Sequence, residues 1–309
     1  MPKDIYIQAD APDPVLDHEL VLSFARRHVP SARAVTGVDE SGGEARAYAI
    51  DAEIIFKTQR PQQLRPRTSL EKENFFLQQI ATLLPELRVP RVLGYGREGK
   101  YLEYTVMTRV PGVALRHAHL DGAARLDVMR ELGSTLRRIH QLPQAPFGAS
   151  GLFPGDASAA DTRARFTELF DDSVARIHQE KRPWSLPLSP EQVGRRALAL
   201  LPDGEDRVAL HSNPWHEHTF VDPASGKFTG LIDFGDAYIS HPVFDLRRWR
   251  TREERAALLE GYTQDQPVGD AFMQTWLVAH VVGDLAAIAQ QPMLGPAAHA
   301  DLARILHEL

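Results

Sequence analysis

Apolar residues in the first part of the chain follow two different spacings. From residue 14 to residue 28 they recur at helical intervals, including Leu16, Leu20 and Phe24, and predict an amphipathic helix over Pro14–His28. Asp13, directly before the proline, is predicted to cap this helix. Shorter alternating runs, separated by glycine and aspartate, then predict antiparallel strands joined by hairpins. These runs are Ala32–Gly37, Arg46–Ile50 and Ile54–Thr58.

A second helix is predicted over Ser69–Leu84, where the helical spacing returns. Ser69 is a residue type that caps helix N-termini, because its hydroxyl accepts a hydrogen bond from a backbone N–H of the first turn. The apolar residues of the predicted buried face are Phe75, Phe76, Ile80 and Leu83. Two more strands are predicted after the helix, Arg91–Tyr95 and Leu102–Met107.

After Pro111 and Gly112 the pattern becomes mainly helical. The predicted helices are Gly122–Gln141, Asp161–Gln179, Pro190–Leu201, Arg252–Tyr262, Ala271–Ala289 and Pro296–His307, and the stretch Pro143–Ala160 is predicted to be a loop. Three strand-like pieces interrupt the helices, Val208–His211, Thr219–Val221 and Thr229–Ile232. A β-rich front and a helical back predict an α+β fold with two lobes, residues 1–108 and 109–309.

Composition narrows the class of protein. At 309 residues the chain is long enough for two lobes, and its 41 acidic against 35 basic residues give a net charge of −6, which argues against general nucleic-acid binding. The absence of cysteine excludes disulfides, thiolate metal sites and thiol nucleophiles. No run approaches the roughly 18 apolar residues of a membrane span, and the first residues do not resemble a signal peptide. No membrane partner and a cytoplasmic location are therefore expected, while the oligomeric state has no signature.

The segment Leu210–Trp249 holds the residues with the clearest chemistry. It contains a polar loop that begins at His211, a short hairpin-like stretch, and Asp233-Phe234-Gly235 after an apolar strand. This order resembles the aminoglycoside and macrolide phosphotransferase superfamily, kinase-like enzymes that phosphorylate antibiotics and small alcohols. The resemblance is strongest over Leu210–Trp249, moderate over Ile54–Gly112 and thin elsewhere. It implies a protein-kinase-like fold and transfer of the γ-phosphate of ATP or GTP to a hydroxyl of a small molecule.

The resemblance assigns four candidate elements that bind the nucleotide. Lys57, at the end of a strand, would contact the phosphates, and Glu73 on the next helix would hold its ammonium group, with Glu71 as the competing acid. The glycine turn Ser41, Gly42 and Gly43 would lie over the phosphates, although a plain hairpin turn also explains it. The segment that includes Met107 and Arg109 would offer its backbone to the nucleotide base, although an ordinary turn explains it too.

A metal ion is the second implied requirement. Asp233 matches the aspartate that binds Mg²⁺ between the phosphates, and a carboxylate oxygen is the ligand that Mg²⁺ prefers. His218 stands where the family's second metal ligand, an asparagine, usually lies. Imidazole suits softer divalent ions better than Mg²⁺, but macrolide phosphotransferases also have histidine at this loop position. A histidine that only packs against the loop is the alternative.

The catalytic loop departs from the family at its most important position. The family pattern is His-x-Asp-x-x-x-x-Asn, and this chain has His211, Asn213 and His218 at the three named positions. His211 is implied to be structural, and Asp245 to support the loop from a distance. Asn213 stands where the carboxylate base belongs, and a neutral amide takes no proton. An impaired enzyme is therefore expected, and a non-catalytic, kinase-like nucleotide-binding protein is the alternative.

Two further possibilities concern metals and substrates. The histidines 211, 216 and 218 permit a zinc-dependent hydrolase, although their spacing is a weak signature. Acids in the helical part could attract a cationic antibiotic, with two tryptophans as platforms, although each is also explained as a solvated helix residue. These residues are Glu168, Asp171, Asp172, Asp265, Asp270, Asp284, Trp184 and Trp276, and for any single one of them the solvated helix face is the preferred explanation.

Overall fold

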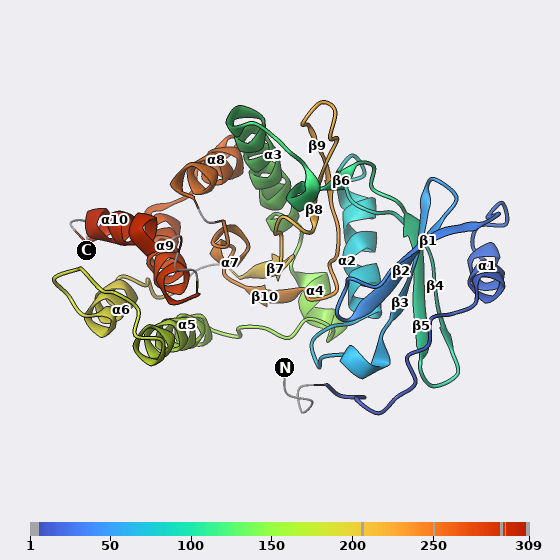
Figure 1. The fold of residues 1–309 in the computed structure, drawn as a ribbon, viewed down its shortest axis with the longest axis horizontal. Coiled ribbons are helices and arrows are strands. Elements are labelled where there is room, and N and C mark those ends of the chain that lie inside the picture. The colour runs from blue at the N-terminus through green and yellow to red at the C-terminus, as the bar shows by residue number, and fades with distance from the viewer. Residues whose placement is uncertain (1–5, 205–206, 250, 291–292, 294, 307–309) are drawn as a thin grey trace. The chain divides into compact units, whose positions relative to one another are not determined.

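The computed structural model describes residues 6–204, 207–249, 251–290, 293 and 295–306 (Figure 1). Its internal contacts divide the chain into two compact units, each made of three separate segments. Unit 1 comprises Met1–Leu120, Leu142–Pro154 and His211–Tyr238, and unit 2 comprises Asp121–Gln141, Gly155–Leu210 and Ile239–Leu309. The predicted lobe boundary after residue 108 stays a prediction. The compact units are not continuous segments, so they do not correspond to a division at that residue.

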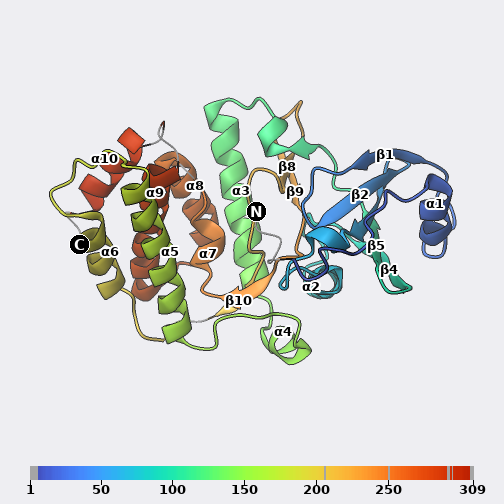
Figure 2. The same ribbon diagram turned by 60° about the horizontal axis from the view of Figure 1, so that its bottom comes forward.

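Unit 1 is built on a five-stranded antiparallel sheet with the order β1-β2-β3-β5-β4. The strands are β1 Val35–Asp39, β2 Ala45–Ile50, β3 Ile54–Gln59, β4 Val92–Glu98 and β5 Leu102–Thr108. Helices α1 (His18–Arg26) and α2 (Leu70–Leu83) lie on opposite sides of this sheet (Figures 1 and 2). The β-rich front predicted from the alternating runs is therefore confirmed.

The sheet sorts its residues between the two helices by the twofold period of a strand. Phe56 is fully buried and stacks on Phe24 of α1 and on Tyr104, with ring centroids 6.4 and 5.0 Å apart. Because neighbouring residues of a strand point to opposite faces, Lys57 then points to the side of α2. The alternation thus places one lysine of β3 where α2 can supply a partner.

Two details of the predicted helices were wrong. The first helix begins at His18 and is capped by Asp17, because the carboxylate of Asp13 instead forms ion pairs with Arg46 and Arg60 at 3.2 and 3.0 Å. The second helix is capped by Ser69 as predicted, but Leu83, its last residue, is 47% exposed. The buried face of α2 includes Leu77, Ile80 and Phe76, and Phe75 is half-buried.

A second, three-stranded sheet in unit 1 holds the segment that resembles a kinase. It contains β6 Val113–Ala114, β8 Thr219–Val221 and β9 Phe228–Leu231 in the order β6-β8-β9, all antiparallel. The short helix α4 (Ala145–Ser150) was missed from the sequence, where its proline, its glycine and the glycine that follows it are typical of a loop. It brings Phe147 into an aromatic cluster with Phe76, Phe153 and Phe234. Two 3-10 turns, η2 Pro61–Gln63 and η3 Leu115–His117, complete the unit.

Unit 2 is mainly helical, as predicted. The described helices are α3 Gly122–His140, α5 Ala159–Gln179, α6 Pro190–Ala199, α7 Val243–Leu246, α8 Arg252–Thr263, α9 Asp270–Gln290 and α10 Gly295–Ile305. Strand β7 (Val208–Leu210) pairs with β10 (Tyr238–Ser240). Helices α3 and α8 can pack closely because Gly133 has no side chain. A Cβ atom at that position would lie 2.1 Å from the carbonyl oxygen of Leu258. His307, the predicted end of the last helix, lies outside the described residues.

Helix α9 is apolar over its whole length and, by length and composition, is the described helix that could cross a membrane. More than half of its apolar window is buried inside unit 2, where it packs against α5, α6, α7 and α10. Residues such as Val278, Val281 and Leu285 are fully buried there. A helix that is hydrophobic all round is typical of the core of a larger protein, and the packing of α9 fits that description.

Candidate functional site

The ammonium group of Lys57 joins three elements of unit 1. Its Nζ lies 2.8 Å from Oε2 of Glu73 on α2 and 2.6 Å from Oδ1 of Asp233, two residues after β9. The competing acid, Glu71, instead pairs with Arg97 on the surface at 2.7 Å. The structure therefore brings together the three residues that the sequence singled out as the phosphate and metal group, and it favours Glu73 over Glu71.

The charges of this triad depend on one another. Burial raises the pKa of Glu73, whose side chain is 1% exposed, even though Lys57 acts in the opposite direction. Burial also opposes ionisation of Asp233, but Lys57 and His218 hold the pKa of that carboxyl well below its usual range. The two carboxylates in turn raise the pKa of Lys57 against its own burial. The lysine is therefore charged, and Asp233, with 40% of its side chain exposed, is the ionised acid that faces solvent.

Glu73 also fixes the position of the triplet that contains Asp233. Its second oxygen, Oε1, accepts a hydrogen bond from the backbone N–H of Phe234 at 3.2 Å. The ring of Phe234 is fully buried against Phe76 of α2, with ring centroids 5.0 Å apart. One buried carboxylate thus orients both the lysine and the aspartate by charge and by hydrogen bonding.

The imidazole of His211 joins its own loop to Ile232, the residue after β9. The Nδ1 atom accepts a hydrogen bond from the Asn213 N–H at 3.2 Å, so the ring proton lies on Nε2, which donates to the carbonyl oxygen of Ile232 at 2.8 Å. His211 is fully buried, and neither nitrogen is left to bind a metal. This geometry argues against a zinc site with three histidines, and His216 instead lies 3.1 Å from Glu217.

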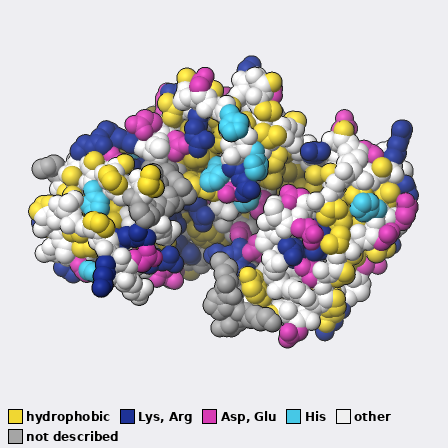
Figure 3. Space-filling view, viewed as in Figure 1, with side chains coloured by type: hydrophobic (Ala, Val, Ile, Leu, Met, Phe, Trp, Pro, Cys, Tyr) yellow, Lys and Arg dark blue, Asp and Glu magenta, His cyan; other side chains and the backbone are white. Residues whose placement is uncertain are grey.

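His218 connects the loop to Asp233. Its Nδ1 lies 2.8 Å from the carbonyl oxygen of Asn213, which only accepts, so Nδ1 carries a proton. Its Nε2 lies 3.2 Å from Oδ2 of Asp233. In the neutral ring a lone pair on Nε2 therefore lies beside a carboxylate oxygen, and the two atoms could bind one cation together. Figure 3 shows histidine side chains gathered on one face of unit 1, over β6 and β8.

Asp233 and His218 could bind a divalent cation whose remaining coordination positions are filled by a bound ligand. In the described part of the chain, no three His, Asp or Glu side chains form a metal site by themselves. Mg²⁺ is typically bound through one or two carboxylates together with substrate phosphates, so a full protein cage is not required. Asp233 supplies the hard oxygen and His218 a nitrogen beside it.

Two of the four described non-glycine residues with positive φ lie at this site. Ser212 and Asp233 have φ angles of 80° and 72°, in the left-handed region that residues with a side chain rarely occupy. Each such residue costs about 1–3 kcal/mol and persists only where its surroundings hold it in place. The bond between His211 and the Asn213 N–H supports Ser212, and the bond between Glu73 and the Phe234 N–H supports Asp233.

Asp236 belongs to the same region but was not assigned as a site residue. Its carboxylate accepts hydrogen bonds from Thr68 and, at 3.0 Å, from Arg65. The backbone N–H of Ser69, the N-cap of α2, donates to the carbonyl oxygen of Gly235 at 3.3 Å. The end of the triplet is thus tied to the start of α2, and the only signal for this in the sequence was the position of Asp236 next to the triplet.

The segment after β5 has fewer backbone groups available to bind a nucleotide base than the sequence indicated. Met107 is buried within β5, and the Arg109 N–H donates to the Glu53 carbonyl oxygen at 2.7 Å. Among the described residues, the Val110 N–H forms no hydrogen bond, and Pro111 has no N–H to donate. Val110 was not singled out from the sequence, because a backbone donor leaves no mark in the residue type.

The glycine turn takes no part in the Lys57 triad. Arg60 donates to the carbonyl oxygen of Gly42 at 3.2 Å, and the Ser41 N–H donates to Asp39 at 2.8 Å. A side chain on Gly42 would lie 2.7 Å from the Ala45 carbonyl oxygen, while Gly43 has room for one. Gly42 is therefore required by the turn itself, and a role of Ser41–Gly43 over the phosphates stays a prediction.

Unit 2 contains Asp245, the predicted support of the loop. It is fully buried on α7, and its Oδ2 lies 3.0 Å from Nε2 of His140, whose Nδ1 in turn lies 2.9 Å from the Tyr262 hydroxyl. Within this unit Asp245 therefore orients α3 and α8. Its link to the loop of unit 1 stays a prediction.

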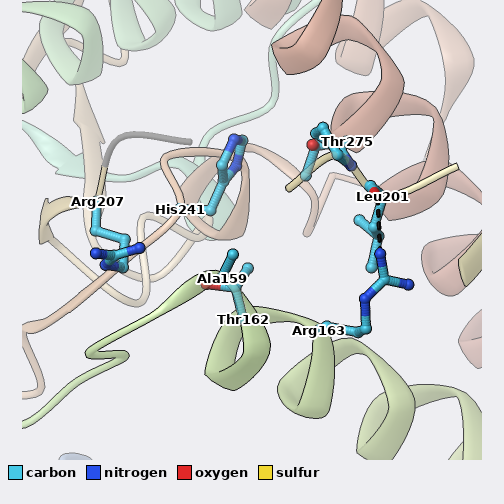
Figure 4. Close-up of a pocket in the computed structure, with 8 residues that line it drawn as sticks. Ala159, Thr162, Arg163, Leu201, Arg207, His241 and Thr275 are labelled. Carbon is cyan, nitrogen blue, oxygen red and sulfur yellow. Dashed lines mark hydrogen bonds between the residues drawn. The ribbon is translucent and has the colours of Figure 1, made fainter. Parts of the chain in front are cut away.

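A small cavity in unit 2 lies beside His241 (Figure 4). It encloses about 20 Å³, which is room for roughly one water molecule. Arg163 on its wall donates to the carbonyl oxygens of Leu198 and Leu201 at 2.6 and 2.7 Å, and the second of these bonds is drawn in Figure 4. The side chains around this cavity support the ends of helices, and its volume is too small for an antibiotic.

Comparisons with known proteins agree with this geometry. A model described as the phosphotransferase enzyme family matches residues 36–280. An aminoglycoside 3'-phosphotransferase of Streptomyces fradiae is 27% identical over 151 residues, which are 48% of this chain and 52% of that protein, so the chain spans about half the length of this curated relative.

Solved structures show the same fold. Macrolide 2'-phosphotransferase MphH from Brachybacterium faecium is similar with a TM-score of 0.54 and 21% identity, over 93% of this chain and 97% of that chain. The GDP complex of aminoglycoside 2'-phosphotransferase-IIIa is similar with a TM-score of 0.58 and 12% identity, over 95% and 98% of the two chains. The predicted kinase-like α+β fold is thereby confirmed.

One of the acids considered for substrate binding is not accessible. Asp284 on α9 is 2% exposed and receives a hydrogen bond from Arg255 at 2.8 Å, and Arg255 also pairs with Asp301 at 3.2 Å. Burial raises the pKa of Asp284 to about 6, against the opposing effect of Arg255. The other five acids are exposed, whereas Trp276 is buried.

The folded state therefore binds a proton at Asp284 more tightly than the unfolded state does, and the resulting stability is lost as the pH rises from about 4 to about 6. We expect Asp284→Asn to remove this dependence. The variant should gain stability relative to the parent across that range, by at most roughly 3 kcal/mol. Urea unfolding at several pH values measures the difference, with the exposed Asp265→Asn as control. A difference that does not change with pH would contradict this expectation.

Proposed function

Because the chain belongs to the phosphotransferase enzyme family, we propose that it transfers the γ-phosphate of ATP or GTP to a hydroxyl group of a small molecule. The observation that supports this most strongly is the single ammonium group of Lys57 between Glu73 and Asp233. Phosphoryl transfer needs its phosphates gripped, their charge neutralised and the acceptor aligned, and the triad addresses the first two needs.

In this proposal Lys57 binds the phosphates nearest the nucleoside while Glu73 holds it in place. The Val110 N–H is the backbone donor left for the nucleotide base, in place of the Arg109 N–H. When bound, Mg²⁺ would neutralise the phosphate charge, and Asp233 with His218 would hold it. His211 positions the loop by fixing the backbone of Asn213 on one side and Ile232 on the other.

Asn213 limits the proposed reaction. An amide can orient the acceptor hydroxyl but takes no proton, so the proton must leave without a positioned base. A general base typically contributes roughly 10²- to 10⁴-fold, or about 3–5 kcal/mol. We therefore infer that this chain is a slow enzyme whose binding machinery is intact.

The substrate class rests on the relatives alone. Their names specify aminoglycosides and macrolides, and we propose an aminoglycoside- or macrolide-type antibiotic or a similar polyol as the acceptor. The expected cytoplasmic location is part of the same proposal, because the phosphate donor is a nucleoside triphosphate. The alternative, a kinase-like protein that binds nucleotide without turnover, is favoured by one observation, the amide of Asn213 at the position of the base.

We expect Glu73→Gln to weaken nucleotide binding by roughly 10- to 100-fold, because Lys57 loses a buried, charged partner. Isothermal titration calorimetry with ATP and with GTP in the presence of Mg²⁺ measures this. The matched control is Glu71→Gln, which breaks only the surface pair with Arg97 and should change the affinity less than about twofold. Equal losses in the two variants would remove Glu73 from the proposed site.

We expect Asn213→Asp to raise phosphate transfer by roughly 10²- to 10⁴-fold with little change in nucleotide affinity. Release of nucleoside diphosphate, measured with a panel of aminoglycosides and macrolides and with water alone, gives the rate. Asn213→Ala is the control and should not raise it. If the aspartate variant binds nucleotide but transfers phosphate to no acceptor, the proposal of a phosphotransferase is wrong. The alternative, a protein that binds nucleotide without turnover, would then be favoured.

A further inference from the structure

A groove of about 510 Å³ in unit 1 includes the segment of Val110 but none of the residues of the Lys57 triad or of the loop at His211. One wall is the segment Thr108–Pro111 at the end of β5, and another is the turn between β8 and β9 with the first residues of β9, together residues 222–229. Arg88 and Val89, in the loop before β4, close it. We call it the Arg109 groove. None of Lys57, Glu73 and Asp233 lines it, so it is distinct from the proposed phosphate and metal site.

The Arg109 groove is positively charged in a chain whose net charge is −6. Arg88, Arg109 and Lys227 line it, with Asp222 as the one acid. In the part of the chain that the structure describes, neither the Arg109 guanidinium nor the Lys227 ammonium group forms a hydrogen bond or a salt bridge, and both side chains are exposed. Neither cation is therefore held by a hydrogen bond or a salt bridge, although Lys227 lies near enough to Asp222 to attract its carboxylate.

Asp222 offsets only one of the three positive charges of the groove, and its carboxylate is held within its own turn. Its Oδ1 accepts from the Ala224 N–H and its Oδ2 from the Ser225 hydroxyl, both at 2.9 Å. These bonds, that of the Ala224 backbone first, lower the pKa of Asp222. An incoming anion would therefore meet a surplus of positive charge.

The walls of the groove are fixed before any ligand arrives. Arg88 donates to the Phe228 carbonyl oxygen at 2.7 Å, and the Thr229 hydroxyl donates to the Pro111 carbonyl oxygen at 2.6 Å. Gly112 has a φ of 93°, and a side chain there would lie 2.2 Å from the carbonyl oxygen of Val221. A rigid site binds more tightly because less conformational freedom is lost on binding.

We propose that the Arg109 groove binds a small anion that carries a phosphate or pyrophosphate group. Arginine presents a planar fork that matches phosphate oxygens, and lysine adds a point charge, so the three cations suit a ligand with two or more negative charges. Val89, Val110 and Pro111 give the groove an apolar part that can contact an organic portion of the ligand. Its volume lies within the roughly 300–1,000 Å³ typical of small-molecule sites.

The test must separate this groove from the nucleotide site. Inorganic pyrophosphate is titrated calorimetrically into the full chain carrying Lys57→Gln, in EDTA and at about 0.15 M salt, where weak long-range attraction is screened. We expect saturable binding. Arg109→Gln combined with Lys227→Gln should weaken it by roughly tenfold or more, because two charge-assisted contacts are lost. Phenyl phosphate and inorganic phosphate, titrated in parallel, distinguish an organic ester from the free ion.

The control removes the same charge elsewhere in unit 1. Arg33→Gln combined with Lys100→Gln changes two exposed cations far from the groove in the chain and should alter the affinity less than about twofold. Lys227→Glu, a single reversal at an exposed position, should abolish binding without unfolding. Hydrogen exchange should slow at residues 108–111 and 222–229 when pyrophosphate is bound.

Several results would overturn the proposal. They are the absence of saturable binding, an equal loss in the groove variant and the control, and protection confined to other segments. Since the Lys57→Gln background and EDTA disable the proposed nucleotide site, the groove can succeed while the phosphotransferase proposal fails, and the reverse.

Discussion

The buried carboxylate of Glu73 is the constraint on which the candidate site depends. A charge with 1% of its side chain exposed costs several kcal/mol to bury unless it is paired and hydrogen-bonded. Lys57 supplies the opposite charge and the Phe234 N–H supplies the hydrogen bond, so both must lie where Glu73 requires them. A residue on α2 thereby fixes one on β3 and the triplet after β9, which are far apart in the sequence.

The rest of unit 1 can be understood as support for this arrangement. The two-residue period of β3 turns Lys57 towards α2, and the Ser69 cap and Asp236 hold the start of that helix to the triplet. His211 joins the backbone of Asn213 to that of Ile232, the residue after β9, through its two ring nitrogens. The strained backbone at Ser212 and Asp233 is maintained by these bonds, as is common where side chains must be presented to a ligand.

The sequence was sufficient for the chemistry-bearing side chains and for most elements. Lys57, Glu73 and Asp233 could be named because their order on strand, helix and strand end is specific, and strong periodicity located the helices. It was insufficient where a contact between distant residues decides the outcome. Asp13 has the residue type of a helix cap, but its pairing with Arg46 and Arg60 follows only from the fold.

Backbone groups and surfaces were also beyond the reach of the pattern. The free N–H of Val110 depends on which neighbour takes the Arg109 N–H, and residue types do not record that. The Arg109 groove is assembled from three segments, each of which reads as an ordinary loop or turn by itself. The helix α4 was missed because its proline and its glycine are more typical of a loop than of a helix.

The central claim is that the Lys57 triad binds a nucleotide together with a divalent cation through Asp233. The most direct measurement is calorimetric titration of ATP and GTP into the chain and into Asp233→Asn, with Mg²⁺ present and with EDTA. We expect the parent chain to need Mg²⁺ for binding, and the variant to lose that need together with roughly tenfold or more of the affinity. For either nucleotide, equal affinity in both proteins and under both conditions would contradict it.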